Sequence, residues 1–336
     1  MTEQTYWHIR FTGTITPMDP LATCPPHLTR RQNDPTPIPH MPVYEGGTVE
    51  QRPYFPAAGL RGAIRHAGVE WLHNQLGTAF DLDTFYLLTV GGAKGSGDED
   101  REDVAAARAF RARNPHIGLW GAGAPWMRSR IRMGHAVAPE AVAPVHIGGV
   151  RGDDVMRAPE FAHAMLAESD WRTWQDQAAL LHERTRLRAE RPNADKERVS
   201  EIDGSIKAIN EQLTRDVSVQ LPLAGFQAIP AGVPLRHRME LHGVTPIEAG
   251  LFLQQLSMFA ADPLVGAQKA RGQGRIAAEW KIEARPMHHL GFDPAGWATI
   301  GDDGLTLDDP RDVMGLDAFN DAFNDPDNFD FRAGAR

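Results

Sequence analysis

The segment 266–275 combines glycines and cations in an order that suits phosphate binding, and it reads Gly-Ala-Gln-Lys-Ala-Arg-Gly-Gln-Gly-Arg. Glycine tolerates positive φ and lets a ligand approach the backbone closely. Lysine and arginine supply the charge that a phosphate group needs. A strand-like run from Ile276 to Ile282 follows at once. The candidate binding residues of this loop are Lys269, Arg271, Gly272, Gln273, Gly274 and Arg275.

This loop does not match the common nucleotide-binding motifs. It lacks the Gly-Lys-Ser/Thr ending of a P-loop, and it is not a Gly-x-Gly-x-x-Gly run between a strand and a helix. The backbone of a polyanion is therefore favoured over a mononucleotide or a dinucleotide. The alternative is an ordinary loop that precedes a strand.

Two further groups of arginines could meet the same kind of ligand. Arg61 and Arg65 lie one turn apart near the start of a helix that we expect over residues 57–76, with Gly59 just before them. Arg128, Arg130 and Arg132 alternate along an expected strand, residues 128–137, so they should project to one side. The alternative for the second group is an edge strand that uses charge to prevent aggregation.

The overall composition is that of an ordinary globular protein. The chain has 336 residues, of which 42% are hydrophobic and 24% are charged. No apolar run is long enough to cross a bilayer, and no secretory signal is visible at Met1, so we expect a cytoplasmic protein with no membrane partner. The single cysteine, Cys24, excludes an intramolecular disulfide and a multi-cysteine zinc site.

The negative charge is concentrated at one end of the chain. The net charge is −9, and residues 291–336 hold eleven aspartates against three arginines, which leaves about −1 for residues 1–290. A nearly neutral body with local arginine clusters can bind nucleic acid, because the overall isoelectric point does not decide it. The acidic segment is expected either to be disordered or to dock on the body.

The order of elements predicts an α+β protein with an elaborated ferredoxin-like, RRM-like sheet. We expect a body over residues 1–290 and an acidic tail over residues 291–336. Two insertions should interrupt the body, an irregular one at about 17–56 and a helical hairpin at about 158–215. Strands are expected at 6–16, 128–137, 217–221, 235–241 and 276–282, helices at 57–76, 104–113 and 245–261, and a protruding hairpin at 145–157.

The sequence shows no catalytic constellation. His-Glu-x-x-His, Gly-x-Ser-x-Gly and Cys-x-x-Cys are all absent. The pair His288-His289 is a weak metal candidate, since adjacent side chains of an extended chain point apart. We therefore nominate no catalytic residue, no metal site and no cofactor.

Three separated segments together resemble one protein family, the RAMP superfamily. Residues 54–65, Tyr-Phe-Pro-Ala-Ala-Gly-Leu-Arg-Gly-Ala-Ile-Arg, are similar to its Leu-Arg/Lys-Gly helix start. Leu119-Trp-Gly followed by Ser129-Arg-Ile-Arg-Met resembles its aromatic-glycine turn and strand, and residues 226–276 resemble its C-terminal half. Within the superfamily the chain looks like the repeated backbone subunit of class 1 CRISPR ribonucleoproteins, and it is most similar to the type IV version.

The resemblance implies a guide-RNA-binding protein. Copies of the chain would polymerise along one CRISPR RNA and present it to target DNA or RNA, together with other subunits of the effector complex. The helix near Gly59 and the glycine loop would contact the RNA backbone, so any guide sequence would be accepted. A thumb hairpin would wedge between bases, and its expected residues are Val150, Arg151, Val155 and Met156.

One departure from the family concerns cleavage. Type III relatives carry a catalytic aspartate shortly before a Pro-Val-like pair. Here Pro42-Val43 marks that place and His40 occupies the aspartate position, with Asp34 a few residues upstream. We therefore expect no cleavage of target RNA. Two alternatives stay open: a RAMP-type endoribonuclease that processes CRISPR RNA with a histidine base, and a metabolic enzyme on a ferredoxin-like scaffold.

Overall fold

The computed structural model describes residues 5–23, 35–77, 79–92, 104–123, 126–148, 160, 163–164, 167–213, 225–308, 315–324 and 328–331. The chain forms two compact units. The first comprises residues 1–147 and 226–336, and the second comprises residues 148–225.

A ferredoxin-like core lies at the centre of the first unit. Its four strands run in the spatial order β11–β1–β10–β6, and every neighbouring pair is antiparallel. This order is the one that a β-α-β-β-α-β chain produces, so the predicted α+β, ferredoxin-like class is confirmed. The strands are β1 (Trp7–Pro17), β6 (Ile131–Met133), β10 (Leu235–Val244) and β11 (Ile276–Pro286).

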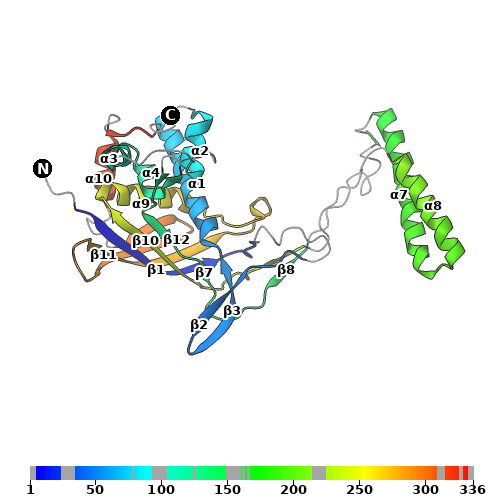
Figure 1. The fold of residues 1–336 in the computed structure, drawn as a ribbon, viewed down its shortest axis with the longest axis horizontal. Coiled ribbons are helices and arrows are strands. Elements are labelled where there is room, and N and C mark those ends of the chain that lie inside the picture. Colours follow the sequence, from blue (N-terminus) through cyan, green and yellow to red (C-terminus); the bar gives the residue numbers. More distant parts are fainter. Residues whose placement is uncertain are drawn as a thin grey trace. The chain divides into compact units, whose positions relative to one another are not determined.

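Two long helices cover one face of this sheet, as Figure 1 shows: α1 (Ala57–Leu76) and α9 (Pro246–Ala260). Both match the expected ranges. A capping box fixes the start of α9, because Thr245 accepts from the Glu248 N–H while the Glu248 carboxylate accepts from the Thr245 N–H. The end of α1 is set by Gly77, which adopts φ 62°.

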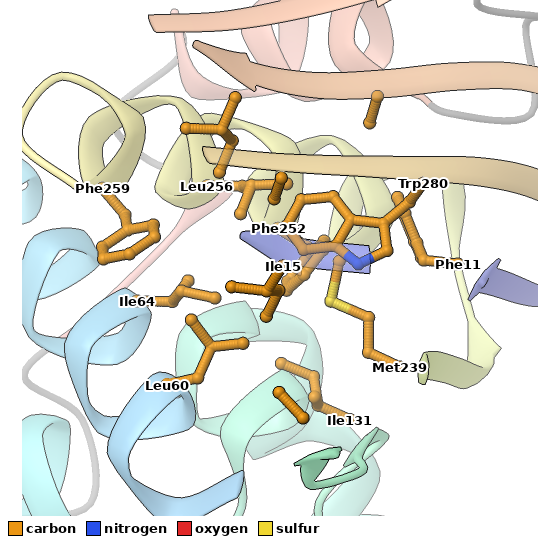
Figure 2. Packing of buried hydrophobic residues seen from close by; sticks show 14 of the residues in the cluster. Phe11, Ile15, Leu60, Ile64, Ile131, Met239, Phe252, Leu256, Phe259 and Trp280 are labelled. Carbon is orange, nitrogen blue, oxygen red and sulfur yellow. The ribbon is translucent and has the colours of Figure 1, made fainter. Parts of the chain in front are cut away.

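The core between the helices and the sheet is built by alternate strand residues. Ile9, Phe11 and Ile15 of β1 point to the helices and are at most 1% exposed. Figure 2 shows Leu60 and Ile64 of α1 in the same cluster as Phe11, Ile15, Phe252 and Trp280. Because every second strand residue faces this core, the remaining residues of β1, β10 and β11 lie on the opposite, open face of the sheet.

The segment expected to be irregular, residues 17–56, contains a β-hairpin, which corrects the prediction. Strand β2 (His40–Glu45) pairs with β3 (Thr48–Phe55). The turn is Gly46-Gly47, with φ of 60° and 85°, as a two-residue hairpin turn requires. The prolines of this region concealed the strands, but β2 forms an edge of the sheet, where proline is tolerated.

The sheet also continues past residue 290, so the boundary expected there does not hold. Strand β12 (Asp293–Gly301) pairs with β11, and β13 (Gly304–Asp308) pairs with β12. Helix α10 (Leu316–Phe323) buries Phe319 against Trp71 and Leu251. The described parts of the acidic segment therefore belong to the body, and their inward residues are mostly small or aromatic.

The remaining elements of the first unit are short. The single strand expected at 128–137 is wrong, because the structure has two short strands there, β6 and β7 (Ala136–Val137). Of the three arginines expected on that strand, Arg132 alone belongs to β6. The expected helix at 104–113 is present as α3. Strand β8 pairs with β9, so the ends of the second unit start from neighbouring strands. The bounds are α2 Leu82–Val90, α3 Val104–Arg113, α4 Pro115–Trp120, β4 Ala122–Gly123, β5 Trp126–Met127, β8 Val145–Ile147 and β9 Phe226–Ala228.

The described residues of the second unit form a helical hairpin, inside the range where the sequence predicts one. Helix α7 (Glu168–Glu190) and α8 (Lys196–Gln212) are joined by a short 3-10 turn, η2 (Arg191–Asn193). Leu187, Ile202 and Ile209 form its buried seam. The expected strand at 217–221 and most of the expected hairpin at 145–157 lie outside the described residues. None of the helices described here is long and apolar enough to cross a membrane.

Candidate nucleic-acid interface

Two motifs that are 200 residues apart in the sequence line one groove. Helix α1 forms one side through Gly59, Gly62 and His66, and the glycine loop contributes Gly266 and Lys269. The groove has a volume of about 450 Å³, which lies in the range of ligand sites. The remaining lining residues are Thr23, Phe55, Ala63, Ala67, Glu70, Met258, Phe259, Asp262 and Leu264.

The groove side of α1 carries very small side chains. Gly59, Gly62, Ala63 and Ala67 recur at helical spacing, so they share one face of the helix. With so little side chain present, the helix backbone itself forms the wall of the groove. A ligand can therefore approach this wall more closely than an ordinary helix surface allows.

The three glycines of α1 have different structural environments. A methyl group at Gly59 would come within 2.7 Å of the Phe55 ring, and one at Gly68 would come within 2.6 Å of the Gln255 side chain. At Gly62 a methyl group would meet no described atom within 4 Å, the backbone of its own helix aside. Packing thus explains Gly59 and Gly68 but not Gly62, although glycine costs about 1 kcal/mol in a helix interior.

The glycine loop presents its cations to solvent. Its ends are held together, because the Val265 N–H donates to the Gly274 carbonyl at 2.9 Å. Gly274 adopts φ 87°, and a side chain there would collide with the Val265 carbonyl. Between these ends lies the 3-10 turn η3 (Lys269–Arg271), after which Gly272 is exposed and Gln273 is half-buried.

Lys269, Arg271 and Arg275 are exposed, and their side chains make no ion pair or hydrogen bond to the residues that the structure describes. Unpaired cations on a loop with fixed ends are available to an anionic ligand without first breaking an internal contact. Phosphate binding by these three side chains is compatible with their exposed positions and stays a prediction.

The arginines of α1 are turned away from the groove, which corrects their expected role. Arg65 is 4% exposed, and its guanidinium donates to the carbonyls of Leu88 at 2.5 Å and Leu87 at 2.9 Å. Burial lowers the pKa of Arg65 to about 10. Arg61 is half-buried and donates to the Trp120 carbonyl and, at 3.3 Å, to the Ser129 hydroxyl.

The start of α1 is also less open than expected. The Ala57 N–H donates to Nδ1 of His135 at 3.0 Å, and the Gly59 N–H donates to the Pro56 carbonyl at 3.0 Å. The Gly59 N–H is therefore not offered to a phosphate. Gly59 contributes to the groove by its lack of a side chain instead.

The three arginines near β6 do not share a face. Only Arg132 belongs to the strand, where it is exposed opposite Glu240. Arg130 pairs with Glu248 and lies 5.5 Å from the Tyr6 ring centre, and the Arg128 side chain is exposed outside any strand. The strand is too short to align them, so the predicted row does not form.

A second hollow, of about 700 Å³, lies beside Arg130 and also involves Arg108 and Arg111. The donors of Arg111 are already engaged, since its guanidinium binds the Gly118 carbonyl at 2.5 Å and the Arg128 carbonyl at 3.3 Å. Arg130 is paired with Glu248. This hollow is therefore a weaker anion site than the groove.

The residues of the expected thumb, Val150, Arg151, Val155 and Met156, lie outside the described residues, and so does Asp34. His40 is exposed at the start of β2, and its Nδ1 lies 3.2 Å from the Ile38 carbonyl. Within the described part of the chain, no group of three histidine, cysteine or carboxylate side chains is arranged to hold a metal ion.

Sequence reasoning missed most residues of the groove, among them Gly62 and His66. Both follow the small-residue spacing that begins at Gly59, and this spacing was the available signal. The groove also holds two carboxylates, Glu70 and Asp262, which would accept hydrogen bonds from hydroxyl or amino groups of a ligand. The site is thus a mixed one: a cation and a histidine for phosphates, acceptors for hydroxyls, and bare backbone between them.

No protein-family model matches the chain, and no curated protein sequence matches it. The solved structures that are similar to it include the following two. A chain of a "Type IV-B CRISPR Complex" is 15% identical with a TM-score of 0.43, over 85% of this chain and 92% of that one. Csc2 of Thermofilum pendens is 13% identical with a TM-score of 0.37, over 83% of this chain and 67% of that one. At these values the likeness decides nothing about function, which depends on the residues of the chain.

Proposed function

We propose that the chain binds single-stranded RNA in the groove between α1 and the glycine loop, and that it serves as a repeated, non-cleaving subunit of a CRISPR ribonucleoprotein. The observation that carries the proposal is Gly62. It lies mid-helix, faces the groove and has open space where a side chain would be. A glycine that its own fold does not need is expected where a ligand backbone must come close.

The surrounding groups fit the backbone of RNA better than that of DNA. Lys269 and the nearby Arg271 are free to bind phosphates. Glu70 and Asp262 are acceptors that a ribose 2′-hydroxyl can satisfy, and this hydroxyl is the group by which proteins tell RNA from DNA. Contacts of this kind read the backbone rather than the bases, so the sequence of the guide would be unrestricted.

The first test is the substitution Gly62→Ala. We expect it to raise the free energy of unfolding by about 0.5–1 kcal/mol, because alanine is the better helix residue. The same change should weaken binding of a labelled oligouridylate by at least about tenfold, since the added methyl group stands in the path of the RNA. Unfolding by urea and fluorescence anisotropy measure the two effects.

The matched control is Gly204→Ala. Gly204 is exposed in the interior of α8 and also has no described atom within 4 Å of its missing side chain. Its substitution should stabilise its own helix by a similar amount and leave the affinity for RNA unchanged. If Gly62→Ala binds RNA as tightly as Gly204→Ala does, the groove is not the RNA site.

Assembly and the absence of cleavage need separate measurements. With a long RNA we expect particles of regularly repeated subunits in negative-stain images, and we expect the RNA to remain intact after prolonged incubation. RNA cleavage that disappears in Asp34→Ala would overturn the non-cleaving role. A thumb at residues 149–156 predicts that deletion of this segment abolishes the regular spacing of subunits along the RNA.

A second candidate function is RNA processing, which one observation favours. His66 lines the groove together with Lys269, and histidine with a neighbouring cation is a common pair for general base catalysis at a phosphate. A single-turnover assay with repeat RNA distinguishes the two functions. Cleavage by the unaltered chain that is lost in His66→Ala would favour processing over scaffolding.

A further inference from the structure

The open face of the sheet is polar along its entire central part. The residues of β1 that point away from the helices are His8, Arg10, Thr12 and Thr14. Their partners on β10 are Arg236, Arg238, Glu240 and His242, and their partners on β11 are Glu279, Lys281, Glu283 and Arg285. Arg132 of β6 extends the same face opposite Glu240. Six Lys or Arg residues thus share this face with three glutamates, and a fourth glutamate, Glu45 of β2, pairs with Arg236 at 3.0 Å.

The cations form the outer layer of this face. The side chains of Arg238 and Lys281 are 55% and 44% exposed, whereas those of Glu240 and Glu283 are 11% and 24% exposed. Glu240 pairs with Arg238 and Glu283 pairs with Lys281 at 2.9 Å, and Arg10 lies between both carboxylates. Glu240 and Glu283 are therefore covered by the cations, so the surface around Arg238, Lys281 and the exposed Arg132 is positive.

One transverse row of the face adds an exposed aromatic ring. Thr12 is opposite Arg238 on one side and Lys281 on the other, and Lys281 is opposite Trp297 of β12. Trp297 is 45% exposed. Since directly opposite residues of antiparallel strands share a face, Trp297, Lys281, Thr12 and Arg238 lie side by side. These four residues span three strand spacings, roughly 14 Å, and Asp308 of β13 continues the row beyond Trp297.

We propose that the open sheet face is a second binding site for single-stranded nucleic acid, with a base stacked on Trp297 and phosphates held by Lys281, Arg238 and Arg132. An aromatic platform beside a positively charged track is the arrangement that binds single strands with little sequence preference. The site is distinct from the groove, because the two lie on opposite sides of the sheet.

A polyanion fits this face better than a protein does. The cores of protein interfaces are depleted in charge and enriched in apolar side chains, but most residues of this face are charged or polar. Its aromatic groups are Trp297 and Phe292, and the Phe292 ring packs on Arg10 and Arg285. Arg132 is exposed and has no ion-pair partner within the described ranges. It is therefore ready to receive a phosphate at no cost to an existing pair.

The test uses the full chain, freed of nucleic acid, and labelled oligouridylate and oligothymidylate of about ten nucleotides, in the range of single-strand site sizes. Fluorescence anisotropy at saturating oligonucleotide should give two strands bound to each chain. Trp297→Ala should weaken the face site at least about fivefold, and Trp297→Phe, which keeps a ring, should bind like the unaltered chain.

The double substitution Arg238→Gln/Lys281→Gln should remove one of the two binding events and leave the affinity and the salt dependence of the other unchanged. The matched control is Lys196→Gln/Lys207→Gln on α8, which removes the same charge from exposed positions of the helical hairpin. Arg132→Gln serves as a second variant, because it breaks no ion pair of the described structure and so should fold normally.

The proposal for the groove and the proposal for the open face can be refuted independently of each other. If Gly62→Ala affects one binding event and the face variants affect the other, both sites exist. If each chain binds one strand and the face variants bind it unchanged, the face proposal is wrong while the groove stands. If the RNA-free chain self-associates in sedimentation and the face variants do not, the face is a protein interface and the proposal is likewise overturned.

Discussion

At the scale of single residues, the glycines of α1 show how one residue type serves different purposes. Gly68 allows the Gln255 side chain to pass, and Gln255 in turn binds Trp120 Nε1 at 2.7 Å and His116 Nδ1 at 2.8 Å. A buried polar group that loses its partners costs more than the hydrogen bond itself contributes. Packing in the core therefore requires glycine at position 68 but not at position 62.

We predict that alanine changes the free energy of unfolding in opposite directions at Gly68 and Gly62. Gly68→Ala should lower the free energy of unfolding by about 1–3 kcal/mol, because the new methyl group overlaps Gln255 in a packed core. Gly62→Ala should raise it. Urea unfolding of the two variants under the same conditions measures the difference, and stabilisation by both changes would show that the Gln255 network gives way easily.

Buried histidines make the stability of the protein depend on pH. Burial lowers the pKa of His116 to about 3 and that of His237 to about 4, against an ordinary value of 6.5. Below pH 6.5 these two histidines become protonated in the unfolded chain but stay neutral in the folded chain. The stability that these neutral histidines allow is thus fully present above pH 6.5 and is lost as the pH falls toward the folded pKa values.

We predict that His116→Gln flattens this dependence. The unaltered chain should lose up to about 1.4 kcal/mol per pH unit from His116 between pH 6 and pH 4, and the variant should lack this contribution. Urea unfolding at several pH values gives the slope for each protein. Equal slopes for the two proteins would mean that His116 becomes protonated without unfolding.

At the scale of elements, the end of the chain is held by aromatic side chains. Phe319 is fully buried, with its ring centre 5.7 Å from that of Trp71. The Phe331 carbonyl accepts from Asn114 Nδ2 at 3.1 Å. Acidic composition suggested a tail, but these phenylalanines and the pairing of β12 with β11 tie the segment to the body.

We predict that Phe319→Ala destabilises the first unit by about 3–5 kcal/mol, as the loss of a buried aromatic ring does. Phe85→Ala is the control, because the Phe85 side chain on α2 is 44% exposed, and it should cost far less. Thermal unfolding separates the two. Equal melting temperatures would show that α10 does not contribute to the stability of the body.

The elements that sequence reasoning found are those with local signals. The capping box at Thr245 and the alternation along β10 and β11 suffice for α9 and its neighbouring strands. The hairpin β2–β3 was missed because five prolines between residues 35 and 53 resemble an irregular segment. Strand β12 was missed because its inward residues, such as Ala295 and Ala298, are too small to give an apolar pattern.

The candidate site was predicted in part, and the reason is physical. Loop cations such as Lys269 stay exposed whatever packs nearby, so composition suffices to find them. The orientation of the Arg61 and Arg65 side chains depends on hydrogen bonds to carbonyls of α4 and α2, which are near these arginines only in the folded chain. Helical spacing correctly placed these two arginines on one face but could not say that the face would be covered.

At the scale of the whole molecule, the helical hairpin is joined to the body at a single place. Ile147 of β8 is directly opposite Phe226 of β9, so residues 148–225 leave and return at neighbouring backbone positions. The hairpin also has its own apolar seam, formed by Leu187, Ile202 and Ile209. Each unit is thus expected to fold without the other.

We predict that replacement of residues 148–225 by a short Gly-Ser turn leaves the first unit folded. Its melting temperature should change by no more than a few degrees, and its groove should bind oligouridylate as before, because no groove residue belongs to the removed part. Circular dichroism and anisotropy are the measurements. Loss of the folded state would show that the two units depend on each other.

The central position of β1 has a consequence for the time course of protein synthesis. Both of its neighbours in the sheet, β10 and β11, begin more than 215 residues later in the chain. A ribosome that adds about 5–20 residues per second needs roughly 10–45 s to make that intervening stretch. During this interval the backbone groups of β1 lack both of the strands with which they pair in the folded sheet. Nascent chains therefore depend on chaperones or dilution to avoid aggregation. A slower ribosome would lengthen this exposure, and the yield of folded protein should therefore fall when synthesis is slowed between β1 and β10.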